Sequence, residues 1–314
     1  MSFVVTLISG PRARALDNRA LERAQHAVST DTGPVWLAPG IAADIAFTAP
    51  DGNLRSHTEA IRAALGSAPI DVVVQPAAGR RKKLLLADMD STMIGQECID
   101  ELAGHLGIKK EVAAITQRAM RGEIEFEPAV RERVALLRGL PITAADEVID
   151  NRIHITPGAR TLVATMRRHG AYTCLVTGGF TLFTHRLAAM IGFDENRANR
   201  LLVDSNGRLT GEVAEPIFGR EAKLATLLDL TQRLHLCREQ SLVVGDGAND
   251  IAMIEAAALG IAYHAKPKVA AVAAARIDHG DLTALLYAQG YRREEFVLND
   301  GRSPDRAQRE PGQI

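Results

Sequence analysis

Two aspartates and two hydroxyl residues follow the short apolar run Leu84 to Ala87, in the order Asp88-Met89-Asp90-Ser91-Thr92. An apolar run without proline or glycine predicts a buried strand of a parallel sheet, and open α/β sheets bind ligands at the carboxyl ends of such strands. Residues two apart on a strand point the same way, so Asp88 and Asp90 can face one site. Because adjacent carboxylates repel unless one is protonated or a cation lies between them, the pair suits Mg²⁺, which prefers oxygen ligands. The competing interpretation is a plain strand followed by a helix cap.

Three further segments could complete a phosphate site. Thr177-Gly178-Gly179 follows a predicted strand and precedes a predicted helix, so a hydroxyl and backbone N–H groups could bind an anion there. Lys223 lies ahead of a predicted helix and could supply a fixed positive charge, although a lone lysine is usually a solvated surface residue. The segment Gly245 to Asp250 follows another predicted strand. Its two aspartates could bind a metal, and its glycines would let the backbone approach a ligand closely. Ordinary turns are the alternative for both glycine-containing segments.

The elements before residue 79 are predicted to form a separate small unit. Strands are predicted at 3–8, 35–37, 43–48 and 70–74, and helices at 17–28 and 56–65. The second helix is predicted to be capped near Ser56 or Thr58. This βαββαβ order is that of a ferredoxin-like α+β module. The basic segment from Pro76 to Lys83 is interpreted as a solvated linker rather than as a nucleic-acid patch.

From residue 79 onward, strands and helices alternate, which predicts a Rossmann-like, doubly wound parallel sheet. Strands are predicted at 84–87, 172–176, 241–244 and 260–263, and helices at 158–169, 181–191, 223–234, 251–258 and 267–275. A hairpin is predicted at 200–213. It would turn at Ser205-Asn206-Gly207, where Asn-Gly would supply positive φ angles. Four helices without an intervening strand, at 97–106, 109–120, 126–137 and 143–151, indicate a helical cap inserted after the first strand. The polar tail, 299–314, is predicted to be disordered.

Composition argues against several classes of protein. The formal net charge is -1 and only 4% of the residues are aromatic, which argues against nucleic acid as a partner. Three widely spaced cysteines without a CxxC pair indicate reduced thiols. The apolar run at 3–8 is too short for a signal peptide or a membrane span, so a cytoplasmic protein with no membrane partner is expected.

Together and in this order, the DxDST, T-G-G, lysine and GDGxND segments resemble the haloacid dehalogenase superfamily of phosphohydrolases over about residues 84 to 290. Within it the chain resembles the phosphoserine phosphatase family, because Glu97 follows Asp88 by nine residues and Met120-Arg121-Gly122 precedes Phe126-Glu127 and Arg131-Glu132-Arg133-Val134. Many relatives have serine where this chain has threonine at 177, which retains the hydroxyl.

The resemblance also implies a division of the chain. Residues 1–78 resemble an ACT-like regulatory or assembly domain. Residues 79–298 would form the phosphatase core, with its helical cap at about 97–155. An ACT-like domain suggests serine as a product inhibitor or regulator and a homodimer, and a degenerate module used only for assembly is the alternative.

The resemblance implies Mg²⁺-dependent hydrolysis of L-phosphoserine to L-serine and phosphate, the last step of serine biosynthesis, through an aspartyl-phosphate. Asp88 would be the nucleophile and Asp90 the general acid and base. The Asp88 carboxylate, the Asp90 backbone carbonyl and Asp246 would bind the metal, which Asp250 would help to orient. The residues implied to bind substrate are Glu97 for the ammonium, Arg133 for the carboxylate, Phe126 as a cover, and Thr177, Gly178, Lys223 and Asn249 around the phosphate.

Two other functions stay open at this point. A related phosphatase or phosphotransferase could act on another small phosphate ester, for example by passing the phosphoryl group to homoserine, because cap geometry sets the acceptor. A phospho-aspartate switch protein would share an acidic Mg²⁺ site and a lysine. Asp90 disfavours the switch, since a general base two residues from the phosphorylated aspartate would hasten loss of the phosphoryl group.

Overall fold

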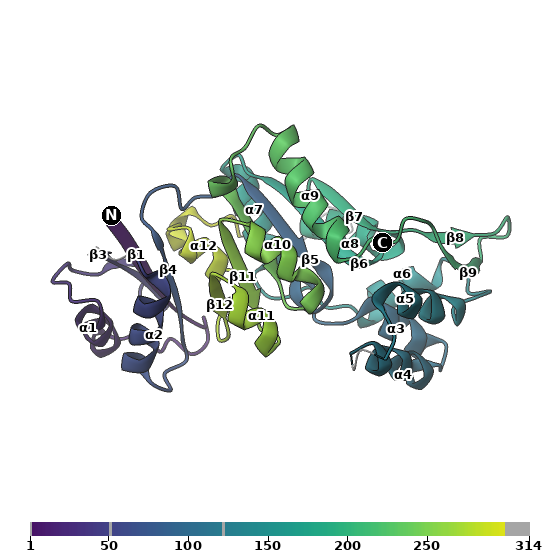
Figure 1. The fold of residues 1–314 in the computed structure, drawn as a ribbon, viewed down its shortest axis with the longest axis horizontal. Helices are drawn as coiled ribbons and strands as arrows, with labels where there is room; N and C mark the ends of the chain where they lie inside the picture. Colours follow the sequence, from purple (N-terminus) through teal and green to yellow (C-terminus); the bar gives the residue numbers. More distant parts are fainter. Residues whose placement is uncertain (1, 50–51, 121–122, 299–314) are drawn as a thin grey trace, which may run out of the picture.

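Two β-sheets lie side by side along the molecule, and a group of helices forms its far end (Figure 1). The computed structural model describes residues 2–49, 52–120 and 123–298. The first sheet comes from the amino-terminal part of the chain and the second is the sheet of the α/β core. The segment 299–314, predicted to be disordered, lies outside the described residues.

The amino-terminal sheet has the strand order β2-β3-β1-β4, and every neighbouring pair is antiparallel. Its elements are β1 (Ser2–Ser9), α1 (Asn18–Ala27), β2 (Val35–Ala38), β3 (Ala42–Thr48), α2 (Leu54–Leu65) and β4 (Ile70–Pro76). This order and direction confirm the predicted ferredoxin-like arrangement. The predicted cap of α2 is wrong, because the side chain of Asn53 accepts the hydrogen bond from the Ser56 backbone N–H, at 3.1 Å.

The core sheet has six strands in the order β12-β11-β10-β5-β6-β7, and all neighbouring pairs are parallel. Its strands are β5 (Leu84–Asp88), β6 (Tyr172–Phe180), β7 (Glu195–Asn199), β10 (Ser241–Gly245), β11 (Leu259–Tyr263) and β12 (Ala275–Ile277). The predicted parallel α/β sheet is therefore confirmed. The two edge strands escaped prediction, β7 because its sequence is polar and β12 because it has only three residues.

Helices cover both faces of the core sheet (Figure 1). One set comprises α7 (Ala159–Arg168), α8 (Thr181–Ile191) and α12 (Ala284–Ala288), and the other comprises α9 (Arg220–Arg233), α10 (Ile251–Ala256) and α11 (Pro267–Val272). Leu85 and Ala87 belong to the apolar cluster of the first set, and Leu84 and Leu86 to that of the second. This alternation along β5 is the two-residue period of a strand buried on both faces.

Two functional segments lie in different elements from those predicted. Thr177 to Gly179 belongs to the end of β6 itself, where the register with β7 becomes irregular, rather than to a turn after the strand. Lys223 lies in the first turn of α9 rather than ahead of the helix, and it is fully buried rather than solvated.

The helices between β5 and α7 form the far end of the molecule, namely α3 (Cys98–His105), α4 (Lys109–Met120), α5 (Phe126–Ala135) and α6 (Ala144–Arg152). The hairpin β8 (Leu201–Val203) and β9 (Leu209–Val213) packs on α5. In its turn Gly207 has a positive φ, +73°, and Asn206 does not, so the predicted pair of positive φ angles is wrong. The domain limits drawn from the sequence stay predictions.

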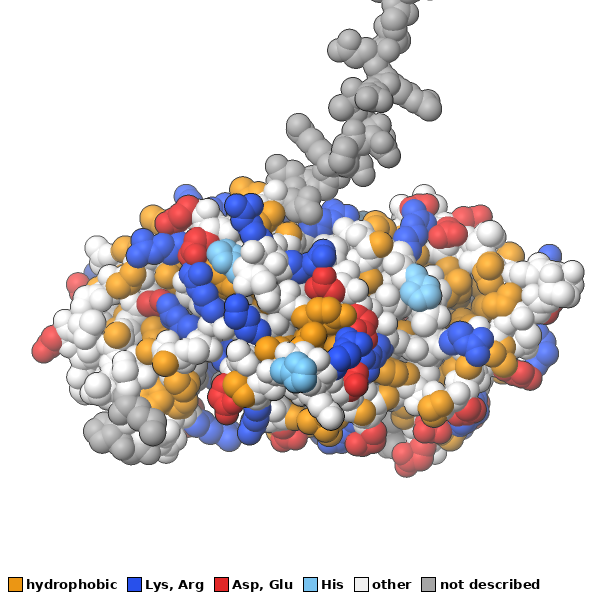
Figure 2. All heavy atoms as spheres, turned by 90° about the horizontal axis from the view of Figure 1, so that it is seen from above, with side chains coloured by type: hydrophobic (Ala, Val, Ile, Leu, Met, Phe, Trp, Pro, Cys, Tyr) orange, Lys and Arg blue, Asp and Glu red, His pale blue; other side chains and the backbone are white. Residues whose placement is uncertain are grey.

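The basic segment between the two sheets is mostly exposed, as a solvated linker would be, but it is also bound to both sheets. Lys82 is buried and its Nζ donates to the backbone carbonyl of Glu239 in the core at 2.8 Å. Arg80 forms an ion pair with Asp44 of β3. Figure 2 shows Lys and Arg side chains gathered on the face above the region where the two sheets meet.

The amino-terminal sheet also contacts the core through β4 and through its apolar face. Asp71 is buried and accepts hydrogen bonds from the backbone N–H groups of Asp278 to Gly280, at 2.7, 3.1 and 2.7 Å. Ile8 and Val73 belong to the same apolar cluster as α12, which packs on β1. The amino-terminal unit therefore shares a hydrophobic core with the α/β unit. Among the described residues, no helix is both long enough and apolar enough to cross a membrane.

Candidate active site

A buried ion-paired group lies at the carboxyl end of the central strand β5. Asp88, the last residue of that strand, accepts a hydrogen bond from Lys223 Nζ to its Oδ1 at 2.5 Å. The same ammonium donates to Asp250 Oδ1 at 2.6 Å. Lys223 has no exposed surface, so its charge is held in place by these two carboxylates rather than by water.

The charges of this group shift one another's pKa. Burial lowers the pKa of Lys223, but Asp250 and Asp88 outweigh burial and the net shift is upward, which keeps the ammonium charged. Burial, and then the charge of Asp250, raise the pKa of Asp88, and Lys223 opposes both. One ammonium therefore does not balance the negative charge of the site.

Three neighbouring carboxylates carry the excess of negative charge. Asp88, Asp246 and Asp250 each offer an oxygen, and these oxygens lie within 4.8 Å of one another. Burial, and then the charge of Asp250, raise the pKa of Asp246 to about 6. Thr92 Oγ1 donates to Asp246 Oδ1 at 3.2 Å. Three acids with one ammonium and an all-oxygen donor set fit a hard divalent cation such as Mg²⁺.

The glycines of the Gly245–Asp250 segment allow this crowding. A Cβ on Gly245 would lie 2.4 Å from Asp250 Oδ2, so no side chain fits at this position without moving the aspartate. The Gly247 backbone N–H donates to the same Oδ2 at 3.0 Å. Asn249 is half-buried beside Gly247. A Cβ on Gly247 would lie 2.3 Å from Asn249 Oδ1, so a side chain at 247 would collide with this asparagine.

Asp90 lies in the turn Met89–Met93 that follows β5, not on the strand as predicted, and two donors hold its carboxyl group there. The Cys98 backbone N–H, at the start of α3, donates to Oδ1 at 3.0 Å, and Thr177 Oγ1 of β6 donates to Oδ2 at 3.3 Å. The Gly179 backbone N–H in turn donates to Thr177 Oγ1 at 2.9 Å. Burial, and then the charge of Glu97, raise the pKa of Asp90 to about 7. Such a carboxyl group can both give and take a proton near neutral pH.

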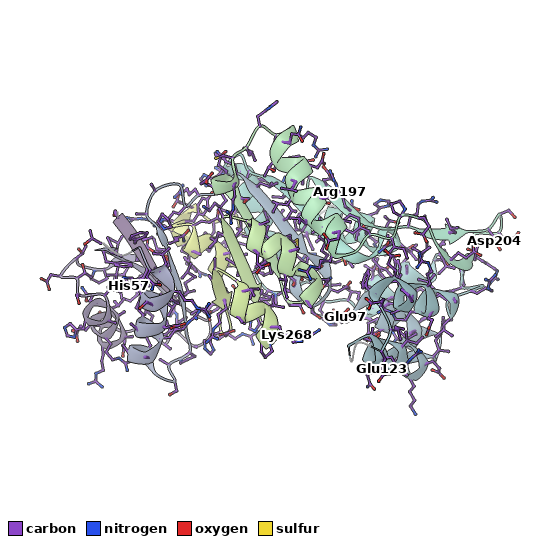
Figure 3. The ribbon with its side chains drawn as sticks, viewed as in Figure 1. His57, Glu97, Glu123, Arg197, Asp204 and Lys268 are labelled. Carbon is purple, nitrogen blue, oxygen red and sulfur yellow. The ribbon has the colours of Figure 1, made fainter. Side chains whose placement is uncertain are left out.

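The helices α3 and α5 bring three further residues to the site. Glu97 caps α3 at the boundary between core and helical end (Figure 3) and accepts a hydrogen bond from Ser91 Oγ at 2.8 Å. Phe126 begins α5, and its ring lies close to Gly178 and Gly219. A Cβ on Gly178 would lie 3.3 Å from the nearest ring carbon, and a Cβ on Gly219 would lie 3.0 Å from the ring carbon nearest to it.

Arg133, also on α5, is half-buried and turns toward the acidic groups. Burial lowers its pKa, and the charges of Asp100, Glu97 and Asp90 oppose that shift. Its Nε donates to the backbone carbonyl of Ala129 at 3.1 Å, and within the described residues no carboxylate lies at ion-pair distance from it. The remaining guanidinium N–H groups are therefore available to an anionic ligand.

Comparison with known proteins gives one family. Residues 85–255 match the family model of haloacid dehalogenase-like hydrolases. A phosphoserine phosphatase of Polaromonas is 44% identical over 209 residues, which is 65% of this chain and 88% of that protein. The chain belongs to the phosphoserine phosphatase family of haloacid dehalogenase-like hydrolases.

Two other relatives extend this assignment. A phosphoserine phosphatase of Mycobacterium tuberculosis is 38% identical over 265 residues, which is 83% of this chain but only 64% of that longer protein. A solved structure described as a phospho-aspartyl intermediate analogue of phosphoserine phosphatase is 38% identical, with a TM-score of 0.61. It covers 66% of this chain, and the match spans 98% of the solved chain.

The structure brings all the sequence-predicted site residues of this phosphatase-family chain to one end of the core sheet. They come from β5 and the turn after it, β6, α9 and the segment after β10, and from the start of α3 and from α5 across the boundary. Their individual roles stay predictions. The predicted motif Met120-Arg121-Gly122 stays a prediction, since residues 121 and 122 lie outside the described residues and the side chain of Met120 is likewise not described.

Sequence reasoning missed Asn199, the last residue of β7. Its buried side chain donates from Nδ2 to the carbonyls of Gly178 at 2.9 Å and Phe218 at 3.0 Å, and its Oδ1 accepts from the Phe218 N–H at 2.6 Å. It thereby joins the end of β6 to the residues that precede α9 and Lys223. A lone asparagine in a polar segment gives no sequence signal of this role, because the bonds depend on two distant segments.

Proposed function

We propose that this protein hydrolyses L-phosphoserine to L-serine and phosphate through a phosphoryl group carried on Asp88. The observation that carries the proposal is the pair of carboxyl groups at the end of β5. One is buried against a fixed ammonium and the other has a pKa raised to about 7. Membership in the phosphoserine phosphatase family supports the choice of reaction.

Asp88 would act as the nucleophile. Lys223 binds its Oδ1, which leaves the other carboxylate oxygen for in-line attack on phosphorus. The ammonium would stabilise the negative charge of the phosphoryl oxygens in the transition state, and its two carboxylate partners hold it in position before the reaction. When substrate binds, the Thr177 hydroxyl would turn from Asp90 to a phosphoryl oxygen, and the Gly178 backbone N–H would bind another.

Asp90 would protonate the departing serine oxygen and then take a proton from the attacking water. Without substrate, the Cys98 N–H and the Thr177 hydroxyl fix the orientation of its carboxyl group, and a raised pKa is what a proton donor needs at neutral pH. Acid–base assistance of this kind is typically worth about 10²–10⁴ in rate.

Asp88, Asp246 and the backbone carbonyl of Asp90 would hold Mg²⁺, with Asp250 and Asn249 orienting the acidic segment. When bound, the metal supplies positive charge that shields the phosphate from the negative nucleophile. The three crowded carboxylates support this part of the proposal, because their mutual repulsion is relieved by a cation.

Substrate choice would come from the helical end. Glu97 can bind the ammonium of phosphoserine, and Arg133, whose guanidinium lacks an ion-pair partner among the described residues, can bind the carboxylate through two parallel hydrogen bonds. Phe126 lies over Gly178 and Gly219 and would exclude water from the reacting phosphate.

Phosphate release from L-phosphoserine tests the proposal. We would compare the wild-type protein with Asp88→Asn, with a metal-free sample, and with Asp17→Asn, an exposed helix cap in the amino-terminal unit. Fast Mg²⁺-dependent release that Asp88→Asn abolishes and Asp17→Asn leaves unchanged is expected. Release from p-nitrophenyl phosphate alone would refute the substrate, and a single turnover on every ester would support a phospho-aspartate switch instead.

The acceptor is tested in the same assay. Added homoserine should leave free phosphate as the main product, because we propose water as the acceptor. Formation of phosphohomoserine in place of phosphate would make the protein a phosphotransferase.

We further propose a cytoplasmic location, a homodimer, and serine as inhibitor or regulator. Deleting residues 1–78 is a poor test of regulation by serine, because the deletion would uncover the apolar face that packs on α12.

A further inference from the structure

A cleft separates the amino-terminal unit from one edge of the core, away from the active-site residues. It has a volume of about 830 Å³ and lies between α2 and β4 on one side and α11 and β12 on the other. These elements face each other across the junction in Figure 1. None of the residues assigned to phosphoserine hydrolysis lines it. A volume of this size can hold a small organic molecule.

The charged side chains that line this cleft do not balance. They are three arginines and two acids, and the acids are already paired: Arg55 Nε lies 3.3 Å from Glu59 Oε1, and Arg276 Nε lies 2.8 Å from Asp278 Oδ2. The fifth residue, Arg62 of α2, is half-buried. Among the described residues its guanidinium has neither an ion pair within 4.0 Å nor a hydrogen bond, so its donors are free, although the charges of Asp278, Asp71 and Glu59 act on it from further away.

Arg62 is also placed where a lone cation is unfavourable. Burial, and then the neighbouring charge of Arg276, lower its pKa, and the charges of Asp278, Asp71 and Glu59 only partly oppose that shift. A second small cavity of about 90 Å³ is lined by the same two arginines together with Asp71 and Asp278. Two guanidinium groups near each other, one of them with all its donors free, form a binding site for a planar anion.

The opposite wall of the cleft is apolar and made of small side chains. It comprises Ala258, Leu259, Ala265, Ala270, Ala271 and Val272, with Ala273 to Ala275 continuing the wall. Small side chains leave room for a ligand beside them, and apolar ones favour its hydrocarbon part. We propose that this cleft binds a small organic carboxylate, with the carboxylate between Arg62 and Arg276 and an aliphatic portion against the alanine wall.

A carboxylate fits better than a phosphate for two reasons. The side chains that line the cleft carry a net charge of one positive unit, and Asp71 lies nearby, so the two negative charges of a phosphate group would exceed the positive charge of the site. The guanidinium fork also matches the two oxygens of a carboxylate in one plane. Inorganic phosphate shares the negative charge but lacks the aliphatic portion, so it separates the two sources of affinity.

Butyrate binding to the full-length protein tests the proposal by ligand-observed NMR, with chloride at equal ionic strength as reference. Arg62→Gln removes the unpaired charge, and Arg55→Gln is the matched control on the same helix, since Arg55 already has a partner. Any carboxylate bound near Arg133 in the active site is retained in both variants. We expect butyrate to bind the wild-type and Arg55→Gln proteins and to bind Arg62→Gln at least about tenfold more weakly.

Melting temperatures provide the second readout and show that the variants fold. Without ligand, Arg62→Gln should melt at or above the wild-type temperature, because burial of this cation and the charge of Arg276 outweigh its attraction to Asp278, Asp71 and Glu59. Butyrate should then raise the melting temperature of the wild type more than that of Arg62→Gln. Equal butyrate affinity in these two proteins, absence of saturable binding to the wild type, or phosphate binding more tightly than butyrate would each overturn the proposal.

Discussion

Truncating Asp71 should destabilise the protein more than any other single change in the amino-terminal sheet outside its apolar core. The carboxylate is 3% exposed and accepts hydrogen bonds from three successive backbone N–H groups of the core, Asp278 to Gly280. In Asp71→Ala these donors lose their acceptor. Asp278 and His279 are exposed residues whose N–H groups water can reach, whereas Gly280 is buried.

The magnitude follows from this difference in access to water. An orphaned buried donor costs about 1–3 kcal/mol, and a lost hydrogen bond to a charged group costs roughly 1.5–3 kcal/mol. Counting Gly280 in full and the other two N–H groups in small part gives a loss of about 2–4 kcal/mol in the free energy of unfolding. Burial raises the pKa of Asp71, so desolvation of the carboxylate already offsets some of its benefit and favours the lower end of that range.

Chemical unfolding followed by two probes would measure the loss. Trp36 is the one tryptophan of the chain and lies on β2, so its fluorescence reports the amino-terminal sheet, while circular dichroism reports the whole protein. We expect the fluorescence transition of Asp71→Ala to move to lower denaturant. Asp17→Ala is the control, because this exposed cap holds one N–H group at 2.8 Å and should cost about 1 kcal/mol. A loss in Asp71→Ala no larger than in Asp17→Ala would refute the reasoning.

Three further predictions concern the active site. Arg133→Ala should lower kcat/KM for phosphoserine by about 10²-fold while changing p-nitrophenyl phosphate little, and equal losses on both would contradict its role as carboxylate clamp. Asn199→Ala should instead lower kcat on both substrates alike, because its side chain joins Gly178 to Phe218 beneath the phosphate, and a selective effect on phosphoserine would be against this. Asp246→Asn should raise the melting temperature of the metal-free protein by relieving repulsion and abolish the rise that Mg²⁺ gives the wild type; a melt that still responds fully to Mg²⁺ would place the cation elsewhere.

The sequence predicted those parts of the fold that depend on residues close together in the chain. The apolar run of β5, with Asp88 at its carboxyl end, is a property of one short segment, and the structure has it as expected, whereas Asp90 lies in the turn after the strand. Lys223 shows the limit of such reasoning. No neighbouring residue indicates that its ammonium is buried, because its two partners lie 135 and 27 positions away in the chain.

The junction between the sheets was misjudged for the same reason, and the consequence bears on function. A basic segment between two units has the composition of a solvated linker, yet Lys82 and Arg80 are bound by groups that the sequence places far away. With Asp71 and the apolar face on α12, they fix the amino-terminal sheet against the core. A sheet held in this way cannot swing freely to signal the presence of a ligand. Any effector of the amino-terminal unit must therefore act through small shifts at the junction, and the cleft beside Arg62 lies between the two surfaces that such a shift would move.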